Sequence, residues 1–171
     1  MAESDTPGGW RAEKEKTGVL IDVASQQVVC RGLAMPHSPR VCQGQVWALD
    51  LGRGQLVRID PQSGRWEVVT KFPGYTRGLA FSGSLAFVGL SRIRETSVFG
   101  GLPIAAEREQ LKCGVGVVDL RSGQQVAAFQ FVDGVEEIFD VQVLPGVLSP
   151  YVSGPWAERD AGQPLWTVPP G

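Results

Sequence analysis

The stretch VWALDLGRGQLVRIDPQSGRWEVV, residues 46–69, predicts two antiparallel hairpins that share their middle strand. The runs 46–49 and 55–59 are rich in apolar and β-branched residues, and the glycines between them permit the positive φ that a hairpin turn needs. The second turn combines Asp, Pro and Gly, and the run 65–71 follows it as an extended segment. Together with the following segment 77–81, the stretch predicts one four-stranded antiparallel unit over residues 42–83, and the run 35–41 is the inner strand that precedes it.

A turn motif within this unit occurs three times along the chain. It consists of an apolar residue, Asp, two variable residues, Ser and a turn residue, and it occupies 21–26, 59–64 and 118–123. The aspartates lie 38 residues apart (60 − 22) and then 59 residues apart (119 − 60), so an insertion of about 20 residues separates similar periods. The Asp residues are expected to cap their own turns. Periods of about 40 residues with four short strands predict β-propeller blades.

The number of repeats limits how many propeller blades the chain can form. The chain begins on the third and fourth strands of one unit, contains two complete units, and ends on the first and second strands of another. The expected terminal strands are 19–23 and 27–31, then 136–144 and 151–153. We therefore expect an all-β fold of about three four-stranded antiparallel blades, a partial β-propeller, whereas closed propellers have about four to eight blades. Either the chain is part of a longer ring, or two copies close a ring of about six blades and cover the open edges.

The expected domain organisation follows from this arrangement. Residues 1–16 are polar and charged and are expected to be disordered or loosely packed. Residues 17–157 form the partial propeller, and the Pro-rich tail 158–171 packs on it. The insertion within 91–112 is broken by glycines and proline, and a short helix is expected near 104–112.

Composition excludes several classes of protein. The formal net charge of −2 over 171 residues gives no general attraction to nucleic acid or to an anionic membrane, and no apolar run is long enough for a spanning helix. The N-terminus lacks the apolar core of a signal peptide, which indicates a cytoplasmic location. The three cysteines are widely spaced and indicate neither a disulfide framework nor a zinc site. We therefore assign no cofactor and no metal.

Candidate functional residues come from the propeller geometry, in which the innermost strands line a central channel. The predicted inner strands are unusually polar, and the repeat makes Ser38, Arg77 and Asp140 equivalent. An anionic or zwitterionic ligand could bind there, or a cation could be held by carboxylates and carbonyls. The ligand-binding candidates, including one arginine of the insertion that could close over the channel mouth, are His37, Arg40, Arg77, Glu137, Asp140 and Arg94.

A purely structural explanation of these residues is also open. Arg77 could pair with Asp140 or Glu137 across the channel without any ligand. His37 is the only histidine, so one chain cannot form a multi-histidine metal site. A catalytic triad with Ser38 is disfavoured because adjacent residues of a strand point to opposite faces. No catalytic residue is assigned.

Several longer sequence segments resemble those of a known family. They are MPHSPR (35–40), GYTRGLAF (74–81), FVGLSRIRETSVFGGLPI (87–104), EEIFDVQVLPG (136–146) and ERDAGQPLW (158–166). In this order they resemble the C-terminal half of a bacterial family of conserved hypothetical proteins with a propeller-like fold. The resemblance implies that an N-terminal half completes the ring, and it brings no activity with it.

Two classes of function remain. The first is a propeller-type binding or protein-interaction module, with a small-ligand site at the channel mouth. The alternative is an enzyme, a hydrolase or lyase that uses polar residues of the inner strands with or without a divalent cation. The expected partners are a second copy of the chain or the missing half, and a protein or small-molecule ligand, but neither nucleic acid nor membrane.

Overall fold

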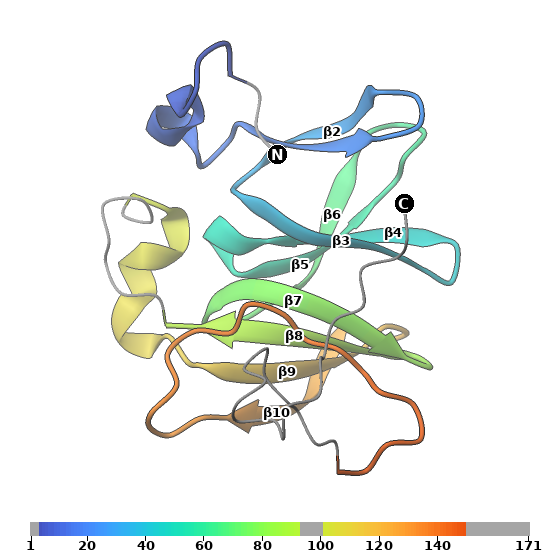
Figure 1. The fold of residues 1–171 in the computed structure, drawn as a ribbon, viewed down its shortest axis with the longest axis vertical. Coiled ribbons are helices and arrows are strands. Elements are labelled where there is room, and N and C mark those ends of the chain that lie inside the picture. Colours follow the sequence, from blue (N-terminus) through green and yellow to red (C-terminus); the bar gives the residue numbers. More distant parts are fainter. Residues whose placement is uncertain (1–3, 93–100, 150–171) are drawn as a thin grey trace, which may run out of the picture.

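Three stacked antiparallel β-sheets make up the computed structural model, which describes residues 4–92 and 101–149 (Figure 1). The first sheet has two strands, and each of the other two has four consecutive strands in a meander. The strands are β1 (Gly18–Asp22), β2 (Gln27–Leu33), β3 (Pro36–Cys42), β4 (Gln45–Asp50), β5 (Gln55–Ile59), β6 (Trp66–Lys71), β7 (Tyr75–Ser82), β8 (Leu85–Ser91), β9 (Gly114–Asp119) and β10 (Gln124–Gln130). The predicted all-β class is confirmed.

Helical structure in the described residues is limited to short 3₁₀ segments. They are η1 (Gly9–Glu13), η2 (Leu51–Arg53) and η3 (Pro103–Gln110). The short helix expected within the insertion is therefore present as η3, with a kink at Glu107 where φ is −104°. None of these segments has the length and apolar character needed to cross a lipid bilayer.

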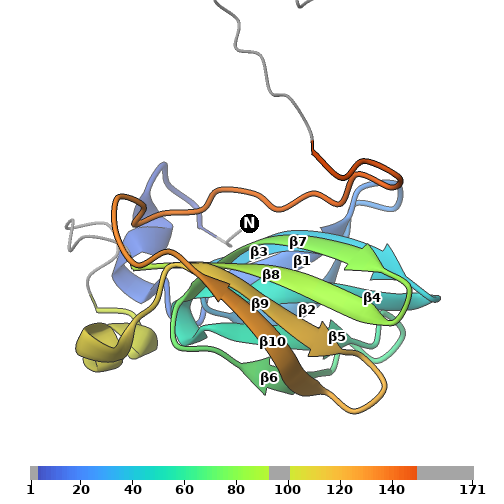
Figure 2. The same ribbon diagram turned by 90° about the horizontal axis from the view of Figure 1, so that it is seen from below.

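The predicted strand over 136–144 is wrong. This segment lies along β7 in both views of the ribbon, but it forms no ladder with a described strand (Figures 1 and 2). Instead, the backbone N–H of Ile138 donates to Oγ of Ser91 (2.8 Å), and the Glu136 carbonyl accepts a hydrogen bond from the Arg92 N–H (2.8 Å). The end of β8 thus satisfies these polar backbone groups locally. The strand expected at 151–153 and the tail 158–171 lie outside the described residues.

The middle sheet, β3–β6, is buried on both faces. One face contributes Ala48, Val57 and Ile59 to a core shared with Cys30 and Leu33 of β2. The opposite face contributes Trp47, Leu49 and Leu56 to a second core. The β7–β10 sheet contributes Leu79, Val88 and Val118 to the same core. Alternation along each strand therefore fills two cores, one on either side of the same sheet.

The two four-stranded sheets repeat with a spacing of 40 residues in their first hairpins. Cys42 pairs with Gln45 at the β3–β4 turn, and Ser82 pairs with Leu85 at the β7–β8 turn. At this spacing Trp47 corresponds to Phe87 (87 − 47 = 40). Trp47 is only 4% exposed because it packs on the next sheet, with its ring centre 6.1 Å from that of Phe81.

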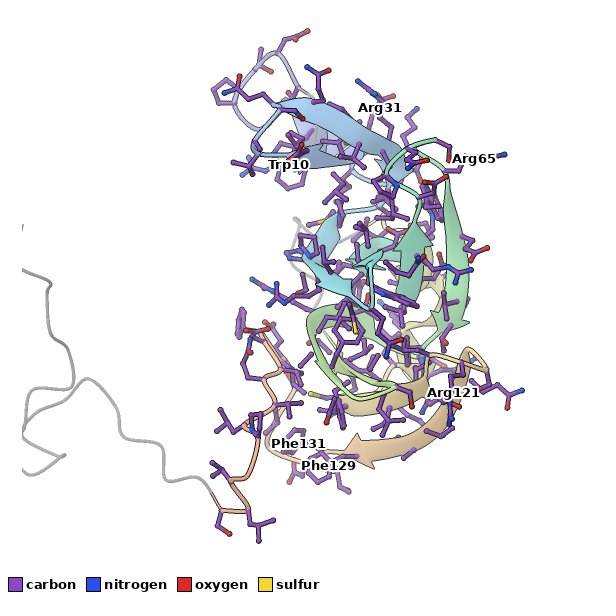
Figure 3. All side chains as sticks on the ribbon, turned by 90° about the vertical axis from the view of Figure 1, so that its right-hand side faces the viewer. Trp10, Arg31, Arg65, Arg121, Phe129 and Phe131 are labelled. Atoms are coloured by element: carbon purple, nitrogen blue, oxygen red, sulfur yellow. The ribbon has the colours of Figure 1, made fainter. Side chains whose placement is uncertain are left out.

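The outer face of the β7–β10 sheet, turned away from β3–β6, is less well covered. Val115 lies opposite Phe129 on this face, and Val117 lies opposite Phe87. Phe129 is 58% exposed, and its ring meets that of Phe131 edge to face at 4.9 Å. The two rings lie at the opposite end of the molecule from Trp10 (Figure 3). The stack therefore ends on an apolar sheet face.

The repeated aspartates close equivalent turns, as predicted. Oδ1 of Asp22 accepts a hydrogen bond from the Ala24 N–H (3.1 Å), and Oδ1 of Asp60 accepts one from the Gln62 N–H (3.0 Å). Oδ1 of Asp119 does the same with the second residue after it, at 3.2 Å. Each carboxylate therefore replaces a backbone acceptor in a tight turn.

The segment that contains η3 covers one end of the stack. Leu102, Ile104 and Leu111 are buried there against Leu51 of η2 and Tyr75 at the start of β7. Strands β3 and β7, which correspond to the predicted inner strands, both begin beneath this apolar cluster. The insertion is therefore attached to the sheets through its own apolar side chains.

Candidate ligand-binding site

The inner strands β3 and β7 carry equivalent bulges that set the direction of the candidate side chains. The pairing of β3 with β4 shifts between His37 and Arg40, and the pairing of β7 with β8 shifts between Thr76 and Leu79. A bulge re-aims the neighbouring side chains and often occurs next to a functional site. Both strands therefore present polar groups that a regular ladder would place differently.

The structural register corrects the alignment of the inner strands by one residue. At the spacing of 40, Ser38 corresponds to Gly78, and both have a left-handed backbone, with φ of 50° and 83°. His37 therefore corresponds to Arg77, and Ser38 does not, contrary to the sequence alignment. Ser38 has a structural contact, because its Oγ accepts a hydrogen bond from the Gly78 N–H (3.0 Å).

Arg77 stacks on an aromatic ring and pairs with no carboxylate in the part of the chain that the structure describes. Its Cζ lies 4.6 Å from the centre of the Phe139 ring. Among the described residues, no Asp or Glu oxygen lies within 4 Å of its guanidinium, so the ion pair expected with Asp140 or Glu137 is not formed. A cation over an aromatic face is held in a fixed orientation and keeps its N–H donors at the ring edge.

Asp140 lies close enough to Arg40 and Arg77 to feel their charge. Its Oδ2 accepts a hydrogen bond from the Gln142 amide (2.7 Å). This bond lowers the pKa of Asp140, and the positive charges of Arg40 and Arg77 add to the lowering. Arg40 itself is exposed, and its Nη1 donates to the adjacent Pro39 carbonyl (3.1 Å). The structure thus brings Arg40, Arg77 and Asp140 into one electrostatic group, which we call the inner-strand cluster.

His37 is half-buried at the edge of this cluster. Burial, together with the positive charge of Arg77, lowers the pKa of His37 to about 4. The imidazole is therefore neutral at neutral pH and offers one donor and one acceptor. A charged histidine beside Arg77 would be unfavourable, which suits the ring to a hydrogen-bonding role.

The remaining candidates lie elsewhere. Glu137 is exposed, next to Glu136, whose carbonyl binds the end of β8. Arg94 lies outside the described residues. In the part of the chain that the structure describes, no three His, Cys, Asp or Glu side chains are grouped so that they could hold a metal ion.

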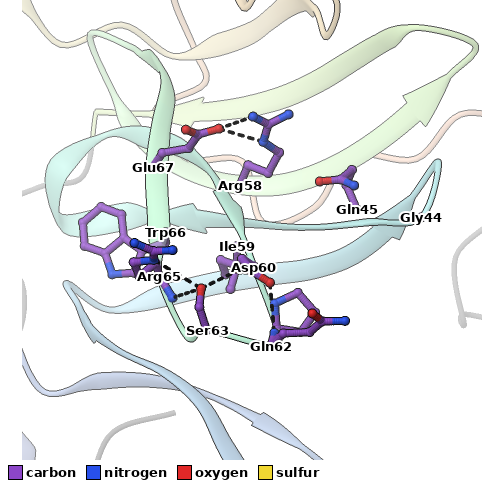
Figure 4. Close-up of a pocket in the computed structure, with 11 residues that line it drawn as sticks. Gly44, Gln45, Arg58, Ile59, Asp60, Gln62, Ser63, Arg65, Trp66 and Glu67 are labelled. Carbon is purple, nitrogen blue, oxygen red and sulfur yellow. Dashed lines mark hydrogen bonds and ion pairs between the residues drawn. The ribbon is translucent and has the colours of Figure 1, made fainter.

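One surface hollow in the described residues is polar and contains none of the candidates. It measures about 780 Å³ and lies over β4, β5 and the turn between β5 and β6 (Figure 4). Its charged groups already have partners, because Arg58 pairs with Glu67, and Nε of Arg65 lies 3.4 Å from Oγ of Ser63. Because its charged groups already have partners, we interpret the hollow as solvated surface and not as a ligand site.

The sequence does not predict two features of the site. The sequence does not indicate that Phe139, directly before Asp140, packs under the Arg77 guanidinium. A cavity also adjoins His37, lined in part by Trp10 and Lys14 of the N-terminal segment. The four-residue spacing of Trp10 and Lys14 in an otherwise polar segment was the available signal.

Comparison with known proteins identifies the family but no activity. Among curated proteins, none matches this chain. The sequence profile of a domain of unknown function, DUF4915, matches residues 1–152. The match covers most of the chain, including every described strand, and the chain therefore belongs to the DUF4915 family.

Proposed function

We propose that the chain is a propeller-type binding module whose inner strands bind a small anion. The propeller arrangement is supported by the spacing of 40 residues between equivalent hairpins and by the order of the stacked sheets. It is also supported by the course of 136–144, which follows β7 without joining a sheet (Figure 2). In such an arrangement the inner-strand cluster faces the central channel.

The single observation that carries the anion proposal is the state of Arg77. A half-buried guanidinium that is held over Phe139 and paired with no described carboxylate keeps several donors available for a planar anion. Arg40 adds a second guanidinium. Neutral His37 can donate a hydrogen bond to the anion, and it carries no charge of its own. Asp140 is exposed and could bind the ammonium group of a zwitterionic ligand.

Calorimetric titration with inorganic phosphate, sulfate and citrate tests the proposal. We expect saturable binding of at least one anion, and Arg77→Gln should weaken that binding by about tenfold or more, because a charge-assisted contact is lost. Arg121→Gln is the matched control, since Arg121 is exposed and pairs with Asp119 at a distant turn. Absence of saturable binding, or equal binding by the two variants, would refute the proposal.

We further infer that additional sheets complete the ring. The candidates are a second copy of the chain and the N-terminal half that the resemblance implies. The inference is supported by the exposed outer face of β7–β10, where Phe87 corresponds to the buried Trp47. It is also supported by the first sheet, in which β1 pairs only with β2 among the described strands.

A further inference from the structure

A cavity of about 460 Å³ lies between the N-terminal segment and the starts of β1 and β3. Its volume is within the range of small-molecule sites, which is roughly 300–1,000 Å³. Its lining is mostly apolar and includes Trp10 of η1, together with Met35 and Pro36 at the start of β3. The imidazole of His37 also lines it. The cavity is therefore suited to an apolar ligand that carries few polar groups.

The indole of Trp10 gives this cavity a flat apolar surface. Trp10 is half-buried, whereas Gly9 and Arg11 on either side of it are exposed. Cζ of Arg11 lies 5.7 Å from the centre of the Trp10 ring, but Arg11 does not line the cavity. A cation over an aromatic ring restricts the orientation of that ring. The N-terminal segment therefore offers an oriented indole against which an aromatic ligand can pack.

The wall opposite Trp10 has an unusual backbone. Met35 and Ser38 both have a positive φ, of 53° and 50°, on either side of Pro36 and His37. Positive φ is uncommon for residues other than glycine, and such strained positions are concentrated at ligand sites. Packing against the apolar cluster that contains Tyr75 helps to hold Met35 there. The backbone that carries His37 into the cavity wall is therefore held in a conformation that a regular strand does not adopt.

His37 is the polar group of the lining that is available to a ligand. Its side chain is half-buried and makes no hydrogen bond or ion pair with any described residue. Burial and the charge of Arg77 lower the pKa of His37 to about 4, so the neutral ring offers one donor and one acceptor. Oγ1 of Thr17 has less than 1 Å² of accessible surface, and Lys14 already has an interaction of its own. The available recognition group is therefore uncharged.

We propose that this cavity binds a small uncharged phenol, a flat aromatic ring with one hydroxyl group. The ring packs against Trp10 and Met35, and the hydroxyl forms a hydrogen bond with the imidazole of His37. A hydroxyl both donates and accepts, so it can bond to His37 in either neutral tautomer. The proposal goes beyond anion binding at Arg77, and the two sites share only His37.

NMR titration of the full chain with p-cresol and p-xylene tests this proposal, because the two probes differ only by a hydroxyl in place of a methyl group. Met35 is one of two methionines and His37 is the only histidine, so a labelled methyl group and a labelled imidazole report on the cavity directly. Both probes should shift the Met35 methyl signal saturably, whereas p-cresol alone should shift the His37 nitrogens strongly. We expect p-cresol to bind about three- to tenfold more tightly, as one neutral hydrogen bond provides.

Three variants make the outcome specific. His37→Phe keeps an aromatic wall without the hydrogen bond, and it should bind the two probes with equal affinity. Trp10→Ala should weaken both probes but keep the anion binding proposed for Arg77. Arg77→Gln should keep p-cresol binding, so the two proposals can fail separately.

Three results would overturn the proposal. The first is the absence of a saturable shift of the Met35 methyl signal with p-cresol. The second is a preference for p-cresol over p-xylene that is absent from the wild-type chain or is kept in His37→Phe. The third is binding of the carboxylate 4-methylbenzoate as tightly as p-cresol, which would show that a charged group of the chain recognises the ligand.

Discussion

The Ser38 hydroxyl oxygen accepts a hydrogen bond from the Gly78 backbone N–H, with 3.0 Å between Oγ and N. Both residues have a left-handed backbone, and they occupy equivalent positions in β3 and β7. The bond therefore joins two neighbouring inner strands at their bulges. It also fixes the separation of His37 and Arg77, which directly precede the two bonded residues.

Replacing Gly78 by alanine should destabilise the fold and displace the segment around Asp140. An added Cβ would lie 2.5 Å from the Val141 nitrogen and 2.7 Å from backbone carbons of Asp140, at a φ of 83°. We expect a loss of about 2 kcal/mol or more in the free energy of unfolding, measured in urea. Gly83→Ala is the control, because its φ is 57° but no atom lies within 4 Å, so only about 1 kcal/mol should be lost. Equal losses in the two variants would contradict the close packing at Gly78.

Stability should fall as the pH is lowered from about 6.5 to about 4, and His37 should contribute to this fall. The folded-state pKa of His37 is lowered to about 4 by burial and by Arg77, whereas the unfolded value is near 6.5. Between these values the unfolded chain binds the additional proton, so stability is full above the unfolded pKa and decreases toward the folded pKa. His37→Gln should show a smaller loss between pH 7 and pH 5 in chemical denaturation. An unchanged pH dependence in this variant would show that His37 titrates normally in the folded chain.

Asp50→Ala should be among the most damaging single substitutions outside the apolar cores. Asp50 is fully buried, and its carboxylate accepts a hydrogen bond from the Ala34 N–H (2.6 Å) and pairs with Arg53 (2.7 Å). Its removal leaves a buried donor and a partly buried cation without their partner, which typically costs about 3–5 kcal/mol. Asp60→Ala, in an exposed turn, should cost about 1 kcal/mol or less. Urea midpoints measure both, and similar values would contradict the importance of the buried pair.

The exposed outer face of the β7–β10 sheet should cause self-association. We expect light scattering to report a dimer at micromolar concentration, because this face corresponds to one that is buried between sheets elsewhere in the molecule. Phe129→Lys should shift the mass toward one chain. Val68→Lys, at a 47% exposed position on β6, should leave the mass unchanged. A wild-type monomer at all concentrations would contradict closure by a second copy.

The sequence predicted the hairpins because their signals are local. Asp60 and Gly64 fix a turn through their own backbone and side chain, and the apolar runs on either side then have only one short way to pair. The segment 136–144 has a similar pattern of residues but forms no strand, because a ladder needs a neighbour from elsewhere in the chain.

The candidate site was less predictable for a related reason. The sequence identified His37, Arg77 and Asp140 through their places in the repeat, but the one-residue correction comes from the bulges, which depend on the pairing of β7 with β8. The stacking of Arg77 on Phe139 depends on the path of a segment that lies 62 residues later in the chain (139 − 77). No local pattern encodes such a contact.

The insertion between β8 and β9 can change in evolution separately from the β-sheets. Its described part covers the end of the stack through Leu102, Ile104 and Leu111, yet none of these residues belongs to a sheet ladder. Changes of length in this loop therefore leave the register of the described strands intact as long as these apolar contacts are kept. A change in the binding preference of this end of the molecule can therefore be inherited without a change in the sheets that support it.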